Sequence, residues 1–156
     1  MSGHDSGISS VSATTMVGIA FRCALVCLRP GQGDDVCRAS CRLFELVEAC
    51  ALPPRLIGEF TGWALAIEAS AVRAVSLRPI DSLDLCSDER LAAALVAACQ
   101  YDECPALRSC AAALLGSENV GRTLGATRIV AKTLRASQFM LTTVAVQTSN
   151  GTRYAN

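Results

Sequence analysis

The sequence Cys23-Ala-Leu-Val-Cys27, followed after nine residues by Cys37-Arg-Ala-Ser-Cys41, decides the fold. Residues four positions apart lie on one face of a helix, so each pair marks a helical face. The intervening stretch Arg29-Pro30-Gly31-Gln32-Gly33-Asp34-Asp35 stops the first helix and supplies an acidic cap for the second. The two pairs therefore predict an antiparallel helical hairpin in which Cys27 faces Cys37 and Cys23 faces Cys41.

Three interpretations of these thiols stay open. Buried cysteine packs as a small hydrophobe. Two disulfide bonds across the hairpin, like the rungs of a ladder, would require an oxidising compartment or a virion-like exterior. Thiolates also suit a soft metal, Cu(I) above all. The total of nine cysteines is odd, so at least one thiol is free or bonds another chain.

The copper interpretation has a family counterpart. The two C-x-x-x-C pairs resemble those of the bacterial copper-storage four-helix bundles, which implies Cu(I) ligands at Cys23, Cys27, Cys37 and Cys41. Charged residues at 38, 42 and 45 mark the solvent face of the second helix, and so place Cys37 and Cys41 toward the seam of the hairpin rather than at its centre. A seam favours packing or rungs over a core that holds many metal ions.

The sequence pattern of the rest of the chain also predicts helices. Apolar residues 56, 60, 63 and 67 recur at helical spacing, a core stripe anchored by Trp63. The sequence predicts an all-α, antiparallel four-helix-type bundle with short extra helices, formed by a single domain at 14–146 between tails at 1–13 and 147–156. The expected helices are 14–28, 35–50, a third from Pro53-Pro54 to Arg78-Pro79, 88–101, 105–115 closed by Gly116, and 122–146.

Composition narrows the function. Hydrophobic residues make up 51% and charged residues 18%, which favours a packed domain. No apolar run approaches the roughly 18 residues of a membrane span, and no signal peptide is evident, so we expect a cytoplasmic protein without membrane contact. The only histidine is His4, and the paired acids lie at predicted helix ends, where capping explains them. We therefore expect no enzyme activity and no resident cofactor.

The charge distribution is uneven. Residues 1–118 carry a net charge of −5, whereas residues 119–156 carry +5 and no acid. Arg128, Lys132 and Arg135 follow at i, i+4 and i+7 and form one stripe of the last predicted helix. Such a stripe is most often a solvated face, but it also suits phosphate. The predicted nucleic-acid-binding residues are Arg122, Arg128, Lys132 and Arg135.

Three segments carry a resemblance to a known family. Residues 123–130, Thr-Leu-Gly-Ala-Thr-Arg-Ile-Val, resemble the start of the RNA-proximal radial helix in coat proteins of rod-shaped plant viruses of the tobamovirus type. Residues 91–98 resemble the other radial helix, and residues 42–47 a short helix of the same proteins. The paired acids that follow the arginine in that family are absent here. The resemblance implies an RNA-proximal position for Arg128 and a virion location.

Together these patterns predict a self-assembling, coat-like or scaffold-like subunit that works by contact. Its partners are expected to be copies of itself and, through the basic last helix, RNA or an acidic protein surface. A copper-binding bundle is the alternative, and a helical module that offers a groove to a partner helix is a third possibility.

Overall fold

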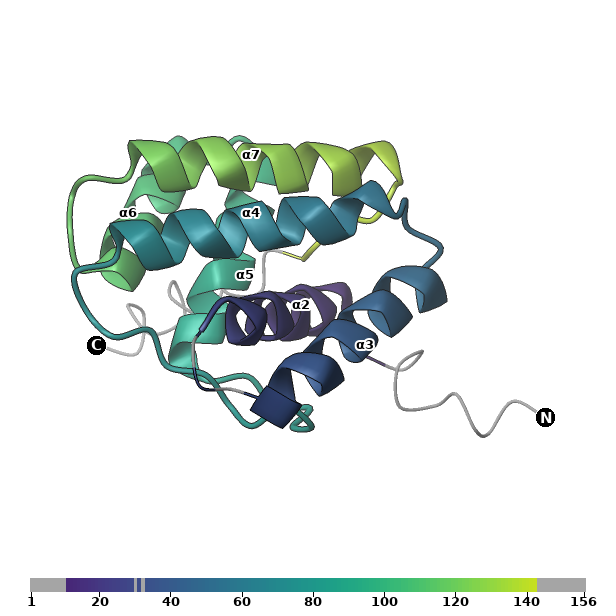
Figure 1. Ribbon diagram of the computed structural model, residues 1–156. Helices are drawn as coiled ribbons and strands as arrows, with labels where there is room; N and C mark the ends of the chain where they lie inside the picture. Colours follow the sequence, from purple (N-terminus) through teal and green to yellow (C-terminus); the bar gives the residue numbers. More distant parts are fainter. Residues whose placement is uncertain (1–10, 30, 32, 143–156) are drawn as a thin grey trace.

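A computed structural model of the chain describes residues 11–29, 31 and 33–142, which form helices without any strand (Figure 1). The predicted all-α bundle is confirmed. The predicted tails lie outside the described residues except for positions 11–13. Across the part that is described, no helix has the length and apolar character to cross a membrane. The helices are α2 (Ala13–Leu28), α3 (Gly33–Ala49), α4 (Arg55–Ser70), α5 (Ser87–Gln100), α6 (Cys104–Leu115) and α7 (Gly121–Ala136).

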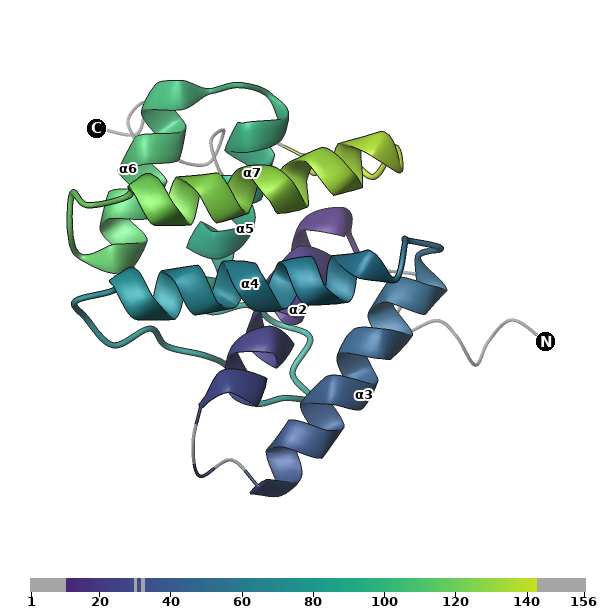
Figure 2. The same ribbon diagram turned by 45° about the horizontal axis from the view of Figure 1, so that its top comes forward.

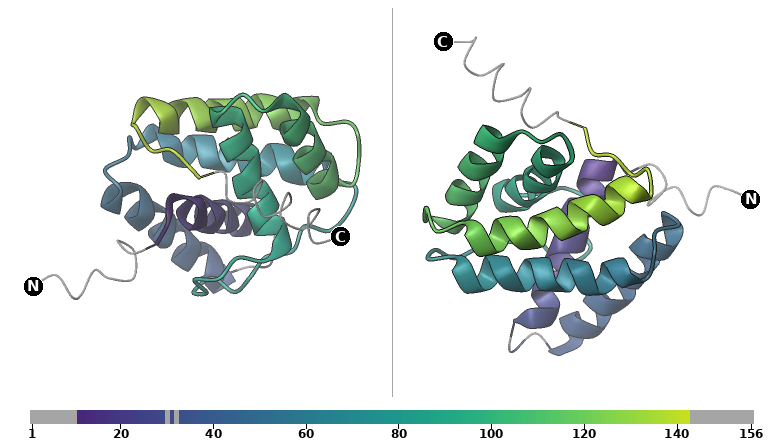
Figure 3. Two further views of the ribbon diagram at one scale, coloured as in Figure 1. Left: turned by 180° about the vertical axis from the view of Figure 1, so that it is seen from behind. Right: turned by 90° about the horizontal axis from the view of Figure 1, so that it is seen from above.

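Helix α2 is the centre of the bundle. It packs against α3, α4 and α5, and residues 16–26 are all buried. A helix that is apolar around its whole circumference has to be covered on every side, and this explains why three helices surround it. Seen from above, α2 crosses beneath α4 at a steep angle (Figure 3).

Helices α4 and α7 lie side by side and run in opposite directions (Figure 1). Trp63 of α4 joins them, since its indole Nε1–H donates to Thr127 Oγ1 of α7 at 3.0 Å. The indole ring also contacts Phe21 of α2 and Phe60, with ring centroids 5.3 and 6.1 Å away. The core role predicted for Trp63 is confirmed, because its side chain is completely buried.

Helix α3 lies at the edge of the bundle (Figure 2). It packs mainly against α2 and has a smaller contact with α4. Only four of its residues are buried, and they form one narrow stripe: Ala39, Leu43, Leu46 and Val47. The predicted α2–α3 hairpin is therefore present, with most of the α3 surface turned to solvent.

Two predicted helix ends are wrong. Helix α4 ends at Ser70 rather than near Arg78. Helix α7 ends at Ala136, whereas the sequence predicted that it continues to Val146. Positions 143–146 of the predicted helix lie outside the described residues. The chain leaves α7 through a Schellman motif: Gln138 has a φ of 60°, its N–H bonds Arg135 O at 2.9 Å, and Phe139 N–H bonds Leu134 O at 2.8 Å.

Residues 71–78, which were expected to extend α4, are irregular instead. They continue into the predicted break before the next helix, so residues 71–86 form one irregular segment that runs along α2. The segment approaches α2 closely at Gly18, where an added Cβ would lie 2.6 Å from Leu85 Cδ1. Arginines fix it in place: Arg29 Nη2 donates to Val75 O at 2.9 Å, and Arg73 Nη1 donates to Leu114 O at 2.7 Å. The helix stops at Ser70 because these long-range bonds hold the following backbone in another path.

Candidate nucleic-acid interface

The basic residues of α7 all face solvent. Arg122, Arg128, Lys132 and Arg135 are exposed, while the opposite side of the helix packs into the core through Leu124, Val130 and Leu134. Among the described residues, none of the four cations has an acidic side chain within ion-pair distance. The acids of this fold are therefore not used to neutralise the stripe.

Three of these cations border one groove. Arg128, Lys132 and Arg135 line a shallow groove of about 390 Å³ between α7 and the end of α5. Cys99 and Gln100 of α5 form its other wall. Arg135 is fixed in place because its Nη2 donates to the backbone carbonyl of Gln100. Gln100 is itself held by Phe139 O and Leu141 N–H, so the wall of the groove is built from well-bonded groups.

The fourth predicted residue, Arg122, lies apart from this group. It does not line the groove, and it lies in the first turn of α7, whereas Arg135 lies in the last. The two are thirteen positions apart, a rise of about 20 Å. The structure thus brings together Arg128, Lys132 and Arg135, and it adds Cys99 and Gln100, which the sequence did not indicate as part of a site.

Burial keeps the groove thiol in its protonated form. Burial raises the pKa of Cys99 to about 11, and the positive charge of Arg128 offsets only part of that shift. A thiol with such a pKa is protonated at neutral pH. The groove therefore offers positive charge and hydrogen-bond donors rather than reactive sulfur.

The hairpin thiols do not meet as predicted. Cys23 is buried, whereas Cys37 and Cys41 are exposed, so the expected facing of these pairs is wrong. Cys27 Sγ instead lies 3.5 Å from Ser40 Oγ and 3.9 Å from Val36 O. Cys37 and Cys41 lie on the outward side of α3 because Ala39 and Leu43 occupy its buried side.

These positions bear on the copper interpretation. Burial raises the pKa of the Cys23 thiol to about 11, so a metal would have to displace its proton. Over the described ranges, no three His, Cys, Asp or Glu side chains are arranged to hold a metal ion. All nine thiols are free. Copper binding through Cys23, Cys27, Cys37 and Cys41 stays a prediction.

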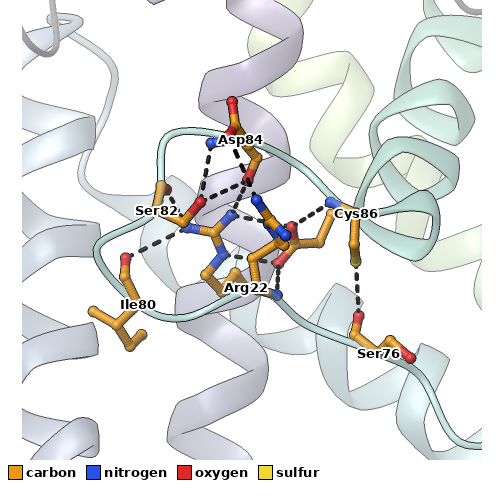
Figure 4. Close-up of polar contacts among 8 residues, drawn as sticks. Arg22, Ser76, Ile80, Ser82, Asp84 and Cys86 are labelled. Carbon is orange, nitrogen blue, oxygen red and sulfur yellow. Dashed lines mark hydrogen bonds and ion pairs between the residues drawn. The ribbon is translucent and has the colours of Figure 1, made fainter.

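The strongest polar cluster is elsewhere, around the buried Arg22 (Figure 4). Arg22 Nε and Nη2 donate to the carboxylate of Glu89 at 2.7 and 3.0 Å. Its remaining N–H groups bond the carbonyls of Ser82 at 2.6 Å, Asp84 at 2.8 Å and Ile80 at 3.4 Å. The backbone N–H groups of Cys86 and Arg78 complete the shell of Glu89.

This cluster is structural. Arg22 uses all of its donors, and each oxygen of Glu89 accepts two hydrogen bonds. No donor or acceptor is left for a ligand, whereas the segment 78–86 is tied to both α2 and α5. A sequence signal for it existed: Arg22 is the only charged residue between Ala13 and Leu28, and a charge in an apolar helix requires a partner.

The pH dependence of folding should report this pair. Burial alone would raise the pKa of Glu89, but the hydrogen bonds from Arg22, Cys86 and Arg78 outweigh it and lower the pKa below 4.5. A lowered pKa means that the stabilisation is complete above the unfolded-state pKa and is lost as pH falls through the folded-state pKa. At neutral pH we expect the urea midpoint of the wild type to be higher than that of Glu89→Gln. The difference between the two midpoints should shrink below pH 4.5. A constant difference would contradict this.

No protein-family model, no curated protein and no solved structure matches the chain. The resemblance to rod-shaped virus coat proteins stays a prediction, and function has to be inferred from the residues themselves.

Proposed function

We propose that the chain is a non-enzymatic, self-assembling structural subunit that binds the phosphate backbone of RNA along α7. One observation carries this proposal: Arg128, Lys132 and Arg135 surround a single groove, all exposed and without an acidic partner among the described residues. A stripe that only solvates a helix is usually interleaved with acids, but α7 has none.

The chemistry of the three side chains suits phosphate. The planar guanidinium groups of Arg128 and Arg135 present paired donors that match phosphate oxygens, and Lys132 adds a compact charge between them. The two arginines are seven positions apart along the helix, a rise of about 10 Å. That span is long enough for contact with more than one phosphate of a strand. Contacts to phosphate carry no sequence information, so we expect binding with little sequence preference.

The absence of a reaction is also part of the proposal. The cluster at Arg22 and Glu89 is saturated by the fold, and Cys99 is protonated at neutral pH. The only histidine, His4, lies outside the described residues. What supports a role by contact is thus the kind of exposed chemistry that α7 offers, which is charge without a nucleophile or base beside it.

The double variant Arg128→Ala/Lys132→Ala should bind single-stranded RNA at least about tenfold more weakly at low salt, which corresponds to about 1.4 kcal/mol. Loss of two phosphate contacts should also reduce the slope of log affinity against log salt by about 1.4. Fluorescence anisotropy of a labelled single-stranded RNA over a salt series measures both quantities. Arg135 is left intact because it bonds Gln100.

Arg90→Ala/Arg108→Ala is the matched control. Both arginines are exposed and lie outside α7, and the variant removes the same net charge. It should keep the affinity and the salt slope of the wild type. Equal losses in the two variants would reject α7 as the interface. Binding that an acidic polypeptide displaces more readily than RNA does would assign the groove to a protein surface instead.

A further inference from the structure

Helix α3 has a second surface that the monomer does not use. We call it the outer α3 face. Phe44 is 62% exposed at its centre, the only phenylalanine among the exposed large hydrophobic side chains of the described residues. The outer α3 face consists of Cys37, Arg38, Cys41, Phe44, Glu45 and Glu48, all exposed.

The spacing along this face is that of a helix–helix seam. Positions 37, 41, 44 and 48 are separated by four, three and four residues. Side chains at this alternation of intervals form the contact line between two helices in a coiled coil. The buried stripe of α3 lies on its other side, at Ala39, Leu43 and Leu46. No helix within the described residues covers this face, so it is open to a helix of another molecule.

The charges select the orientation of that helix. Arg38 lies in the first half of the face, and Glu45 and Glu48 lie in the second half. Arg38 bonds Asp35 and Asp81 yet remains 51% exposed. Glu45 and Glu48 have no cation within ion-pair distance in the described part of the chain. The first turn of α3 is acidic, at Asp34 and Asp35, and Asp35 bonds Arg38. Within the outer α3 face, Arg38 is the only cation and precedes two unpaired acids, so an antiparallel copy brings Arg38 opposite Glu45.

We propose that two copies of the chain pair through their outer α3 faces in antiparallel orientation, about a twofold axis near the middle of the helix. Cys41 then packs against Phe44 of the second copy, and Arg38 lies opposite Glu45 of the second copy. The symmetry repeats each contact, as in other isologous dimers. Phe44 loses its water contact, and both Glu45 carboxylates gain a cation.

This inference rests on the self-assembly part of the proposed function and names its interface. Helix α7 lies across the bundle from α3 (Figure 1). Each dimer therefore presents two α7 faces to solvent, and RNA binding and pairing use separate surfaces.

Charge exchange tests the pairing. Arg38→Glu and Glu45→Arg, each alone, place like charges opposite each other and should raise the dimer dissociation constant at least about tenfold. The double variant Arg38→Glu/Glu45→Arg should recover the wild-type constant, and an equimolar mixture of the two single variants should form a heterodimer. Sedimentation velocity over a concentration series, with reduced thiols, measures all four samples.

The controls separate this from general charge effects and from misfolding. Arg90→Glu and Glu118→Arg make the same charge changes at exposed positions off α3 and should leave the constant unchanged. Should Arg38→Glu disturb the contacts with Asp35 and Asp81, Phe44→Ser tests the same face. Its side chain is mostly exposed in the monomer, so circular dichroism should be unchanged while dimerisation weakens.

A thiol reaction gives an independent measure. In a variant with Cys37→Ser and Cys104→Ser, a short bismaleimide should link the Cys41 thiols of two copies, and Glu45→Arg should suppress the product. A wild-type monomer at all concentrations, or a dimer indifferent to both Phe44→Ser and Glu45→Arg, would overturn the proposal. Loss of RNA binding in Arg128→Ala/Lys132→Ala with an unchanged dimer constant would leave it intact, so the two proposals fail separately.

Discussion

Replacement of Arg22 by methionine should lower the free energy of unfolding by about 3–5 kcal/mol, because it leaves the carboxylate of Glu89 buried without its partner. Both side chains are completely buried in the wild type, and they are joined by two hydrogen bonds. The carbonyl of Ser82 loses its donor as well, and that of Asp84 keeps only the hydroxyl of Ser82 at 3.3 Å. Urea denaturation followed by circular dichroism measures the change at neutral pH.

Two further variants make this result specific. Arg29→Met removes a partly exposed ion pair with Glu68 and the hydrogen bond to Val75 O. Solvent screening should limit the ion pair to about 1 kcal/mol or less, and the hydrogen bond adds about 1 kcal/mol, so the total loss should stay below that of Arg22→Met. Arg22→Met/Glu89→Leu removes both buried charges and should be less harmful than Arg22→Met alone, since no uncompensated charge remains. An Arg22→Met variant no less stable than Arg29→Met would show that the buried pair does not hold the fold.

Replacement of Trp63 by alanine should cost about 3–5 kcal/mol, the range for large aromatic side chains removed from a core. The indole is completely buried, contacts Phe21 and Phe60, and bonds Thr127 across to α7. One substitution thus loosens the contacts of α4 with both α2 and α7. Thermal and urea unfolding by circular dichroism measure the loss without relying on the fluorescence of the only tryptophan.

Thr127→Val separates packing from hydrogen bonding at this place. It keeps the volume of the side chain but leaves the indole N–H unpaired, with an expected loss of about 1–3 kcal/mol. If Trp63→Ala lost no more free energy of unfolding than Thr127→Val, the indole ring would add little to the core. The free energy of unfolding should therefore be lowest for Trp63→Ala, intermediate for Thr127→Val and highest for wild type.

Local signals predicted the starts of the helices better than their ends. Proline at 53, 54 and 105 and glycine at 116 marked boundaries that the structure contains. Three helices, however, end on residues with positive φ that are not glycine: Ala51, Asp102 and Gln138. Each ending has the hydrogen bonds of a Schellman motif, as at Leu52 N–H to Val47 O, 3.0 Å. Without a glycine, only a nearby proline could reveal such an end, and α7 has none.

The first half of the irregular segment, residues 71–78, escaped prediction for a different reason. Its residues are compatible with helix locally, but its path is set by partners far away in the chain, such as Leu115 O for Val72 N–H at 2.9 Å. Asp88 and Glu89 were expected only to cap α5. They also bind Arg73 and Arg22, which a reading of neighbouring residues cannot show.

The candidate interface could likewise be predicted only in part. The spacing of Arg128, Lys132 and Arg135 along one helix predicted their common face, and all three are exposed. Their groove could not be foreseen, because it depends on the packing of α5 against α7, which brings Cys99 and Gln100 to the stripe. The outward direction of Cys37 and Cys41 likewise depends on which side of α3 meets α2, a choice made by Ala39 and Leu43.

The partner of Arg22 lies 67 residues further along the chain. A ribosome adds about 5–20 residues per second, so Glu89 is made roughly 3–13 s after Arg22. During synthesis α2 and α3 can pair early, because they are adjacent, but the apolar sides of α2 that α4 and α5 later cover stay open until those helices emerge. Until Glu89 is made, the guanidinium of Arg22 has no carboxylate partner and has to keep its hydration. The same arginine that ties segment 78–86 to α2 in the finished chain is thus, in the unfinished one, the single charge along an otherwise apolar helix.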